Sequence, residues 1–299
     1  MKAMIWVFCF LAVFLLFRWN IIPDGYKDPL QVGFFVWLLL LLSLNIGYAA
    51  ANKFKELKKP GKAWPMFLSS VLLYGFVYFF IRISGEMAVE NTDLLLLAFP
   101  VLMMVLTPLM AGKKKISIPK FLVFTVALAG AVIILFWGRA FHTDWKTLLI
   151  VAGCGLCWAA FSILADREKK KMWAYLYYSV LGCALLSLAL LLAFSRFVLP
   201  PVDEALRILL LALGIIAMAL FWLSAIRQSG IPLVSTVAYA GFIPLLAVPF
   251  IASGDIPGTT ALSGAGMILL ATVIMALLKE KRRKPKGKKD PEPGRRKSF

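Results

Sequence analysis

Residues 32–52 read VGFFVWLLLLLSLNIGYAAAN, and none of these side chains carries a charge. A helix of about 20 mostly apolar residues is long enough to cross the hydrocarbon core of a bilayer. Ten segments of the sequence have this length and character, and we expect each to be a membrane-spanning helix. They are residues 3–21, 32–52, 65–84, 92–111, 119–138, 147–165, 174–194, 206–226, 232–252 and 260–278.

The composition of the whole chain agrees with this interpretation. Its 299 residues are 61% hydrophobic and only 16% charged, and its mean hydropathy is +0.85. Soluble domains are about half apolar and a quarter charged, so an ordinary soluble enzyme is excluded. The apolar segments lack the alternation typical of a membrane β-barrel, and helices satisfy their own backbone hydrogen bonds in lipid. We therefore predict an all-α membrane protein without a separate soluble domain.

The first segment has an alternative interpretation. Lys2 precedes an apolar run that ends at Phe17, which is also the pattern of a signal peptide. Arg18, Trp19 and Asn20 follow this run in place of a small-residue cleavage site. That ending favours a retained helix that stops at a membrane interface.

The charge distribution predicts the orientation. The net charge of +18 comes from 33 Lys and Arg against 15 Asp and Glu. Lys and Arg collect in cytoplasmic loops, and with the N-terminus in the cytoplasm all but seven fall on that side. The seven are Arg18, Lys27, Arg82, Arg139, Lys146, Arg196 and Arg207. We therefore expect both termini in the cytoplasm.

The basic tail, residues 279–299, has its own predicted role. Its high charge and three prolines predict disorder. We expect it to enforce the topology and to lie near anionic lipid headgroups. We expect no nucleic-acid partner, because such a protein does not bury its basic residues among long apolar runs.

The two halves of the chain show a weak internal repeat. When the third to fifth segments are overlaid on the eighth to tenth, Pro100 meets Pro244 and Tyr78 meets Trp222. Five helices in each half would give the halves opposite orientations, which is the inverted-repeat plan of many secondary transporters. We predict repeats over residues 1–138 and 139–278, followed by the tail.

Several short motifs carry a family resemblance. They are Leu97-Ala-Phe-Pro-Val-Leu102, Gly241-Phe-Ile-Pro-Leu-Leu246, Ala129-Gly-Ala-Val-Ile133, Ser263-Gly-Ala-Gly-Met-Ile268 and Gly155-Leu-Cys-Trp-Ala-Ala160. Through them nearly the whole chain resembles the drug/metabolite transporter superfamily, in its ten-helix EamA-type branch. Lys113 departs from the family pattern, because a glutamate often stands at this position, so no role of that acid is carried over to this chain.

The resemblance implies a permease that works by alternating access. Its substrate would be a small polar or amphipathic metabolite, such as an amino acid, a nucleotide sugar, an amine or a quaternary amine. We expect a multi-pass protein of a prokaryotic plasma (inner) membrane, as a monomer or a homodimer. A lipid or lipid-carrier flippase on the same scaffold is one alternative, and a non-transporting assembly partner with its aromatic side chains packed shut is another.

The third segment offers the best candidate substrate site. Tyr74, Tyr78, Arg82 and Glu86 are spaced by four and share one helical face. Polar groups are costly to bury in a membrane, so we interpret this stripe as one wall of a central cavity between the repeats. The alternative is that Arg82 and Glu86 pair at the interface, with the charges reaching the headgroups.

Further candidates come from other segments. Trp222 occupies the position equivalent to Tyr78, and the remaining candidates are Trp158, Tyr239, Asn45 and Tyr48. Aromatic faces attract cations and would suit an amine, whereas Arg82 would suit a carboxylate or a phosphate. Core packing is the alternative for each tryptophan.

Prolines inside the segments suggest moving parts. Pro100 and Pro244 each remove a helix hydrogen bond, and we predict hinges there, with a static kink as the alternative.

No catalytic chemistry is expected. Cys154 and Cys157 have CxxC spacing inside an apolar segment without a nearby His, so we interpret them as packing residues and not as a metal or redox pair. The sequence has no HExxH motif and no nucleophile–His pair within the apolar segments. We therefore expect a protein that is not an enzyme and that has no metal site and no cofactor.

Overall fold

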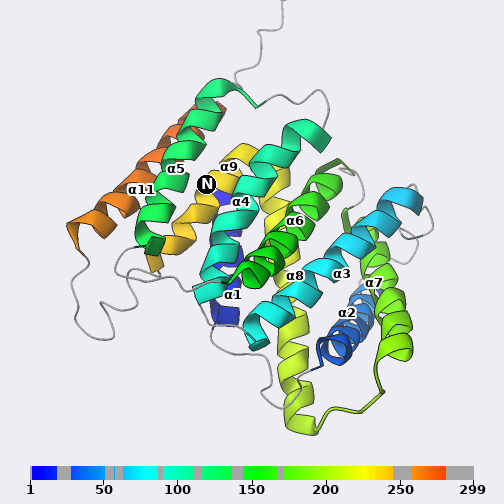
Figure 1. Ribbon diagram of the computed structural model, residues 1–299. Coiled ribbons are helices and arrows are strands. Elements are labelled where there is room, and N and C mark those ends of the chain that lie inside the picture. Colours follow the sequence, from blue (N-terminus) through cyan, green and yellow to red (C-terminus); the bar gives the residue numbers. More distant parts are fainter. Residues whose placement is uncertain are drawn as a thin grey trace, which may run out of the picture.

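The computed structural model describes residues 2–18, 28–50, 57, 63–86, 90–110, 116–136, 144–167, 172–244 and 258–280. Every regular element within these ranges is a helix (Figure 1). In chain order they are α1 (Lys2–Arg18), α2 (Pro29–Ala50), α3 (Ala63–Glu86), α4 (Glu90–Met110), α5 (Ile118–Phe136), α6 (Trp145–Arg167), α7 (Met172–Phe194), α8 (Val202–Ser229), α9 (Ile231–Ala238), η2 (Tyr239–Gly241) and α11 (Thr259–Glu280).

Eight of the described helices, α2 to α8 and α11, are long and apolar enough to cross a membrane. This confirms the all-helical class and agrees with a multi-pass membrane protein. The other two expected spans are described only in part. Helix α1 has 17 residues, and the expected span 232–252 corresponds to an apolar helical segment, Ile231–Pro244. Residues 245–257 lie outside the described part, so ten spans remain a prediction.

Some helices extend beyond their apolar stretches. Helix α2 begins at Pro29, three residues before the expected start, because proline is well tolerated at the first helical position. The Leu30 amide donates to the Asp28 carboxylate at 2.9 Å, which satisfies a free N–H of the first turn. Helix α8 is 28 residues long and has Asp203 and Glu204 in its first turn. Acidic side chains there are favourable because of the helix dipole.

A single glycine joins α8 to the segment that follows. Gly230 has φ of +80° and ψ of 160°, a backbone conformation essentially reserved for glycine. The next segment is itself discontinuous. Helix α9 is followed after Ala238 by the 3₁₀ turn η2. The described part of this segment ends at Pro244.

The helices are arranged around a central group (Figure 1). Helices α5 and α11 pack side by side at one edge of the molecule, and α2, α3 and α7 form the other edge. Between these edges α4 and α6 pack together, α1 packs on α8, and α9 contacts α4, α5 and α11. Segments from both halves of the sequence are therefore neighbours throughout the molecule.

The edge formed by α5 and α11 depends on two glycines. A Cβ atom added to Gly130 would lie 2.5 Å from the Gly264 carbonyl oxygen, and one added to Gly264 would lie 2.7 Å from the Gly130 oxygen. The two backbones are therefore in direct contact, as small residues allow between membrane helices.

The cysteines of the described helices are free thiols. Cys154 of α6 donates to the Phe76 carbonyl at 3.6 Å, and Cys183 of α7 donates to the Ser70 carbonyl at 3.1 Å. Both buried thiols therefore pack against the backbone of α3, one from α6 and the other from α7.

Candidate functional site

Six aromatic side chains from helices α1, α3, α4, α6 and α8 meet in the interior of the molecule. We call them the tryptophan cluster: Phe10, Phe76, Phe99, Trp158, Phe161 and Trp222. The centroids of Trp158 and Trp222 are 6.3 Å apart, and the Phe10 ring lies 6.0 Å from the first and 4.7 Å from the second.

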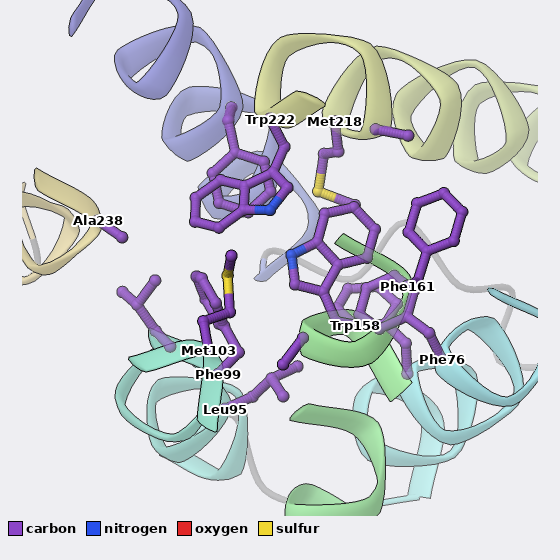
Figure 2. Close-up of a cluster of buried hydrophobic side chains, with 14 of the residues drawn as sticks. Phe76, Leu95, Phe99, Met103, Trp158, Phe161, Met218, Trp222 and Ala238 are labelled. Atoms are coloured by element: carbon purple, nitrogen blue, oxygen red, sulfur yellow. The ribbon is translucent and has the colours of Figure 1, made fainter. Parts of the chain in front are cut away.

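The three other phenylalanines surround this pair. Phe76 lies 4.5 Å from Trp158, Phe161 lies 6.0 Å from Trp158, and Phe99 lies 5.2 Å from Trp222. The side chains of Met103 and Met218 lie among the rings (Figure 2). These soft thioethers pack well against aromatic groups.

Five helices contribute to the tryptophan cluster. Helices α1, α3 and α4 supply Phe10, Phe76 and Phe99, whereas α6 and α8 supply the two tryptophans and Phe161. Both halves of the chain therefore contribute side chains to one buried group.

The Ser162 hydroxyl makes two of the hydrogen bonds in this cluster. It accepts from the Trp222 indole N–H at 2.9 Å and donates to the Trp158 carbonyl at 2.7 Å. Ser162 follows Trp158 by one helical turn, so the two residues share a face of α6. The polar atom of Trp222 is therefore satisfied inside an apolar environment.

The Trp158 indole N–H differs, because it has no hydrogen-bond partner among the described residues. Trp158 is only 1% exposed, so water outside the protein does not solvate this donor. In Figure 2 the two indole nitrogens face each other across the cluster. A buried donor without a partner is uncommon and calls for an explanation such as a bound water or ligand. The cluster thus combines aromatic faces with one indole donor that has no partner in the described part of the chain.

The structure separates the predicted tyrosine stripe from the tryptophan cluster. Tyr74 and Tyr78 stack with their centroids 6.3 Å apart. Phe76 lies two residues from each of them, which places it about 200° around the helix, on the opposite face. Phe76 contacts Trp158 of α6, whereas Tyr74 and Tyr78 stack on each other on the opposite face of α3.

The other members of the stripe are less buried or lie at its end. Arg82 is partly buried on α3, and Glu86 is the last residue of that helix, with its side chain outside the described part. The structure therefore brings Trp158 and Trp222 together, but it places Tyr78 on the face of α3 that points away from them.

The predicted residues of α2 contact α7. Asn45 accepts from the Tyr177 hydroxyl at 3.1 Å and donates to the Leu41 carbonyl at 2.8 Å. Tyr48 is buried and packs edge-on against the Tyr177 ring, at 5.5 Å. These two side chains join helices α2 and α7 and do not belong to the tryptophan cluster.

Tyr239 lies at the break between α9 and η2. Its ring is 5.5 Å from Phe124 of α5, and its hydroxyl donates to the Leu97 carbonyl at 3.4 Å. Leu97 is in the helical turn of α4 that contains the buried Pro100. Pro244 is exposed and is the last described residue of its segment. The two predicted hinges are therefore placed, and their motion stays a prediction.

Ser162 and the phenylalanines of the cluster are not among the site residues predicted from the sequence. Ser162 could have been found, since its spacing of four from Trp158 puts it on the same helical face. The phenylalanines carried no such signal, because the chain has 23 of them.

The described residues contain no group of three or more His, Cys, Asp or Glu that could hold a metal ion. The chemistry that the tryptophan cluster offers is recognition by aromatic faces, thioethers and one indole donor.

Comparison with known proteins bears on the fold alone. No protein-family profile matches the sequence, and no curated protein matches it. Among solved structures, a chain described only as "Crystal structure of protein" superposes with a TM-score of 0.69 and 18% sequence identity. The alignment covers 94% of this chain and 99% of that one. Nearly the whole chain is therefore similar in fold to an experimentally determined structure.

Proposed function

We propose that this protein is a secondary transporter that moves a small polar or amphipathic metabolite across a membrane by alternating access. Its substrate would bind in the tryptophan cluster, between the two halves of the chain. The observation that supports this proposal most directly is the Trp158 indole N–H. It is buried among aromatic rings and has no hydrogen-bond partner in the described part of the chain. A substrate with an acceptor atom would satisfy this donor, and its apolar or cationic part would lie against the aromatic faces.

The packing pattern supports two inverted five-helix repeats within this proposal. In the proposed repeat, helices α1, α2, α3, α4 and α5 correspond to α6, α7, α8, α9 and α11, in that order. Under this correspondence the helix pair α3–α6 is equivalent to the pair α8–α1, and the helices of both pairs pack against each other. The pairs α2–α7, α4–α9 and α5–α11 each consist of two corresponding helices, and the helices of all three pairs also pack against each other. A two-fold relation between the halves would produce this pattern, and it would place the tryptophan cluster at their interface, where inverted-repeat carriers bind substrate. This arrangement agrees with the proposed assignment to the EamA-type drug/metabolite transporters.

A ligand screen on the purified protein tests the proposal. A ligand that binds only the folded protein raises the melting temperature by mass action, so metabolite classes can be compared without knowing the direction of transport. We expect at least one of the amino-acid, amine or quaternary-amine classes to raise the melting temperature. The same compound should then be taken up by proteoliposomes that contain the protein.

Two variants assign the ligand to the cluster. Trp158→Phe keeps an aromatic ring but removes the indole donor, so it should reduce the ligand-induced shift strongly. Trp37 of α2 is a matched control, because it is also 1% exposed and also has an indole N–H without a partner among the described residues. It lies outside the five helices that supply the cluster, so Trp37→Phe should keep the shift. If Trp158→Phe keeps the same ligand-induced rise in melting temperature as Trp37→Phe, the tryptophan cluster is excluded as the site.

A further inference from the structure

Helices α2 and α7 are joined by polar side chains near both ends. The first group, which we call the Asp28 latch, lies where α2 begins and α7 ends. Gln31 of α2 donates to the Arg196 carbonyl and, at 3.3 Å, to the Ser195 hydroxyl. Ser195 in turn donates to the Asp28 carboxylate. These bonds connect positions more than 160 residues apart in the sequence.

Aromatic packing reinforces the Asp28 latch. Phe197, in the connection after α7, has its ring 6.1 Å from Phe34 and 5.8 Å from Phe35 of α2. The chain that leaves α7 is therefore held on the first turns of α2 by hydrogen bonds and by ring contacts together.

The second group, which we call the Asn45 latch, lies near the opposite ends of the same helices. The Tyr177 hydroxyl of α7 donates to Asn45 of α2, and the Tyr177 ring packs on Tyr48. The neighbouring Tyr178 donates to the Leu57 carbonyl, in the connection between α2 and α3. Tyr175 is hydrogen-bonded to Ser69 of α3. Three tyrosines of the first α7 turns thus bind three different places in the first half of the chain.

The two latches lie far apart along the helix axes. Asp28 and Asn45 are separated by 17 positions, which is about 25 Å along an α-helix. Tyr177 and Ser195 have a similar separation on α7, as antiparallel packing of α2 and α7 requires. One latch therefore lies near each end of the α2–α7 pair, and each connects the first half of the chain to the second.

We infer that the two latches are the alternating gates of the proposed transporter along the α2–α7 contact. Opening toward one side requires the halves to separate there, and the polar bonds at that end must break. The other latch stays formed and holds the halves together. Both latches are formed here, so this structure is closed at both ends of the contact.

This inference rests on the proposed function, but its test needs no substrate. Met218 lies in the tryptophan cluster and is fully buried, and Met218→Cys supplies a reporter thiol there. A membrane-impermeant maleimide is added from either side of oriented proteoliposomes, and the protein with only its four native cysteines gives the background.

Two substitutions weaken one latch each. Gln31→Met removes the amide donor at the Asp28 latch, and Tyr177→Phe removes only the hydroxyl at the Asn45 latch. Loss of one hydrogen bond shifts a two-state equilibrium by about two- to ten-fold. We expect Gln31→Met to raise the labelling rate from the Asp28 side by about that factor and to lower it from the other side. Tyr177→Phe should have the opposite effect.

Ser179→Ala is the matched control on α7, because its hydroxyl donates to the Tyr175 carbonyl within the helix. It should leave both labelling rates unchanged. Tyr178→Phe replaces Tyr177→Phe if that variant does not fold.

The inference would be overturned if the labelling rates of the latch variants stay unchanged from both sides. It would also be overturned if both latch variants are labelled faster from the same side. Reciprocal labelling in a protein that neither binds nor transports any of the metabolites would overturn the proposed function and leave the latches in place.

Discussion

At the residue scale, the Ser162 hydroxyl links two tryptophans of the cluster. It accepts from the Trp222 indole and donates to the Trp158 carbonyl, and its side chain is fully buried. Removal of an acceptor leaves a buried donor unsatisfied, which costs more than the hydrogen bond itself contributes. The hydrogen bond of the Trp222 indole N–H therefore depends on one oxygen atom.

We predict that Ser162→Ala lowers the free energy of unfolding by about 1–3 kcal/mol, because it leaves the buried Trp222 N–H without an acceptor. Ser179→Ala is the control, since that serine is equally buried and donates to a carbonyl four residues earlier in the same way. Chemical unfolding of both variants in one detergent measures the difference. A loss as large in Ser179→Ala would mean that the Trp222 bond has no special weight.

A second residue-scale feature is the start of α6. Asp144 precedes the helix, and the Thr147 amide donates to its carboxylate at 2.9 Å. Hydrogen bonds from the Thr147 side chain and then from its backbone lower the pKa of the Asp144 carboxyl below its ordinary value of 3.8. The charged form is therefore favoured in the folded protein.

This pKa shift predicts a pH dependence. A lowered folded-state pKa stabilises the protein at pH values above the unfolded pKa, and the stabilisation is lost as the pH falls through the folded value. Asp144→Ala should therefore be less stable than the unchanged protein at pH 6, and the difference should shrink as the pH falls below about 4. Thermal unfolding at several pH values measures it, and a difference that stays constant down to pH 2 would contradict the assignment.

At the element scale, the contact of α5 with α11 depends on the absence of side chains at Gly130 and Gly264. Both glycines occur in the short motifs that carry the family resemblance, but the sequence did not show that they face each other. An added methyl group meets a backbone oxygen at either position. Backbone atoms cannot rotate away as a side chain can, so the helices would have to move apart.

We predict that Gly130→Ala or Gly264→Ala destabilises the protein by about 1–3 kcal/mol, as overpacking does. Gly266 of α11 is the matched control, because nothing lies within 4 Å of a Cβ atom added there. Gly266→Ala should be neutral or stabilising, since alanine is preferred in a helix by about 0.5–1 kcal/mol. Unfolding midpoints of the three variants test this, and similar losses in all three would refute the close contact.

At the scale of the whole molecule, the number of spans determines how the halves are oriented. Eight described helices are long enough to cross, and the assignment of ten depends on α1 and on the segment that begins with Ile231. Helix α1 packs along α8, and Phe10 of α1 lies within the tryptophan cluster. Both observations favour a transmembrane position for α1.

Reporter fusions can count the spans. We predict that reporters at Lys2, at Gly138 and after Phe299 lie in the cytoplasm, outside and in the cytoplasm, respectively. If α1 does not cross the membrane, the reporters at Lys2 and Gly138 will lie on the same side. If the Ile231 segment does not cross, the reporters at Gly138 and after Phe299 will lie on the same side. Compartment-sensitive reporters, such as a fluorescent protein and a phosphatase, measure the three locations.

Local composition was sufficient to predict the helical membrane class and the position of most helices. Apolar stretches of about 20 residues, such as 32–52, depend only on consecutive side chains, and the cost of burying a backbone in lipid then requires a helix. The polar ends were less predictable, because capping groups such as Asp28 extend α2 to Pro29 beyond the apolar stretch. The prominent tryptophans were also recognised as candidates from their residue type and position.

Only the tertiary structure decided which of these side chains meet. The sequence repeat paired Tyr78 with Trp222, but Phe76 and not Tyr78 faces the tryptophans, and Asn45 joins Tyr177 of α7. A change of one position turns a side chain by about 100° around its helix. The rotation of each helix is set by packing against neighbours that are distant in the sequence, such as α6 against α3. Composition therefore predicts that a segment is a buried helix, whereas its partners depend on contacts that form only in the folded chain.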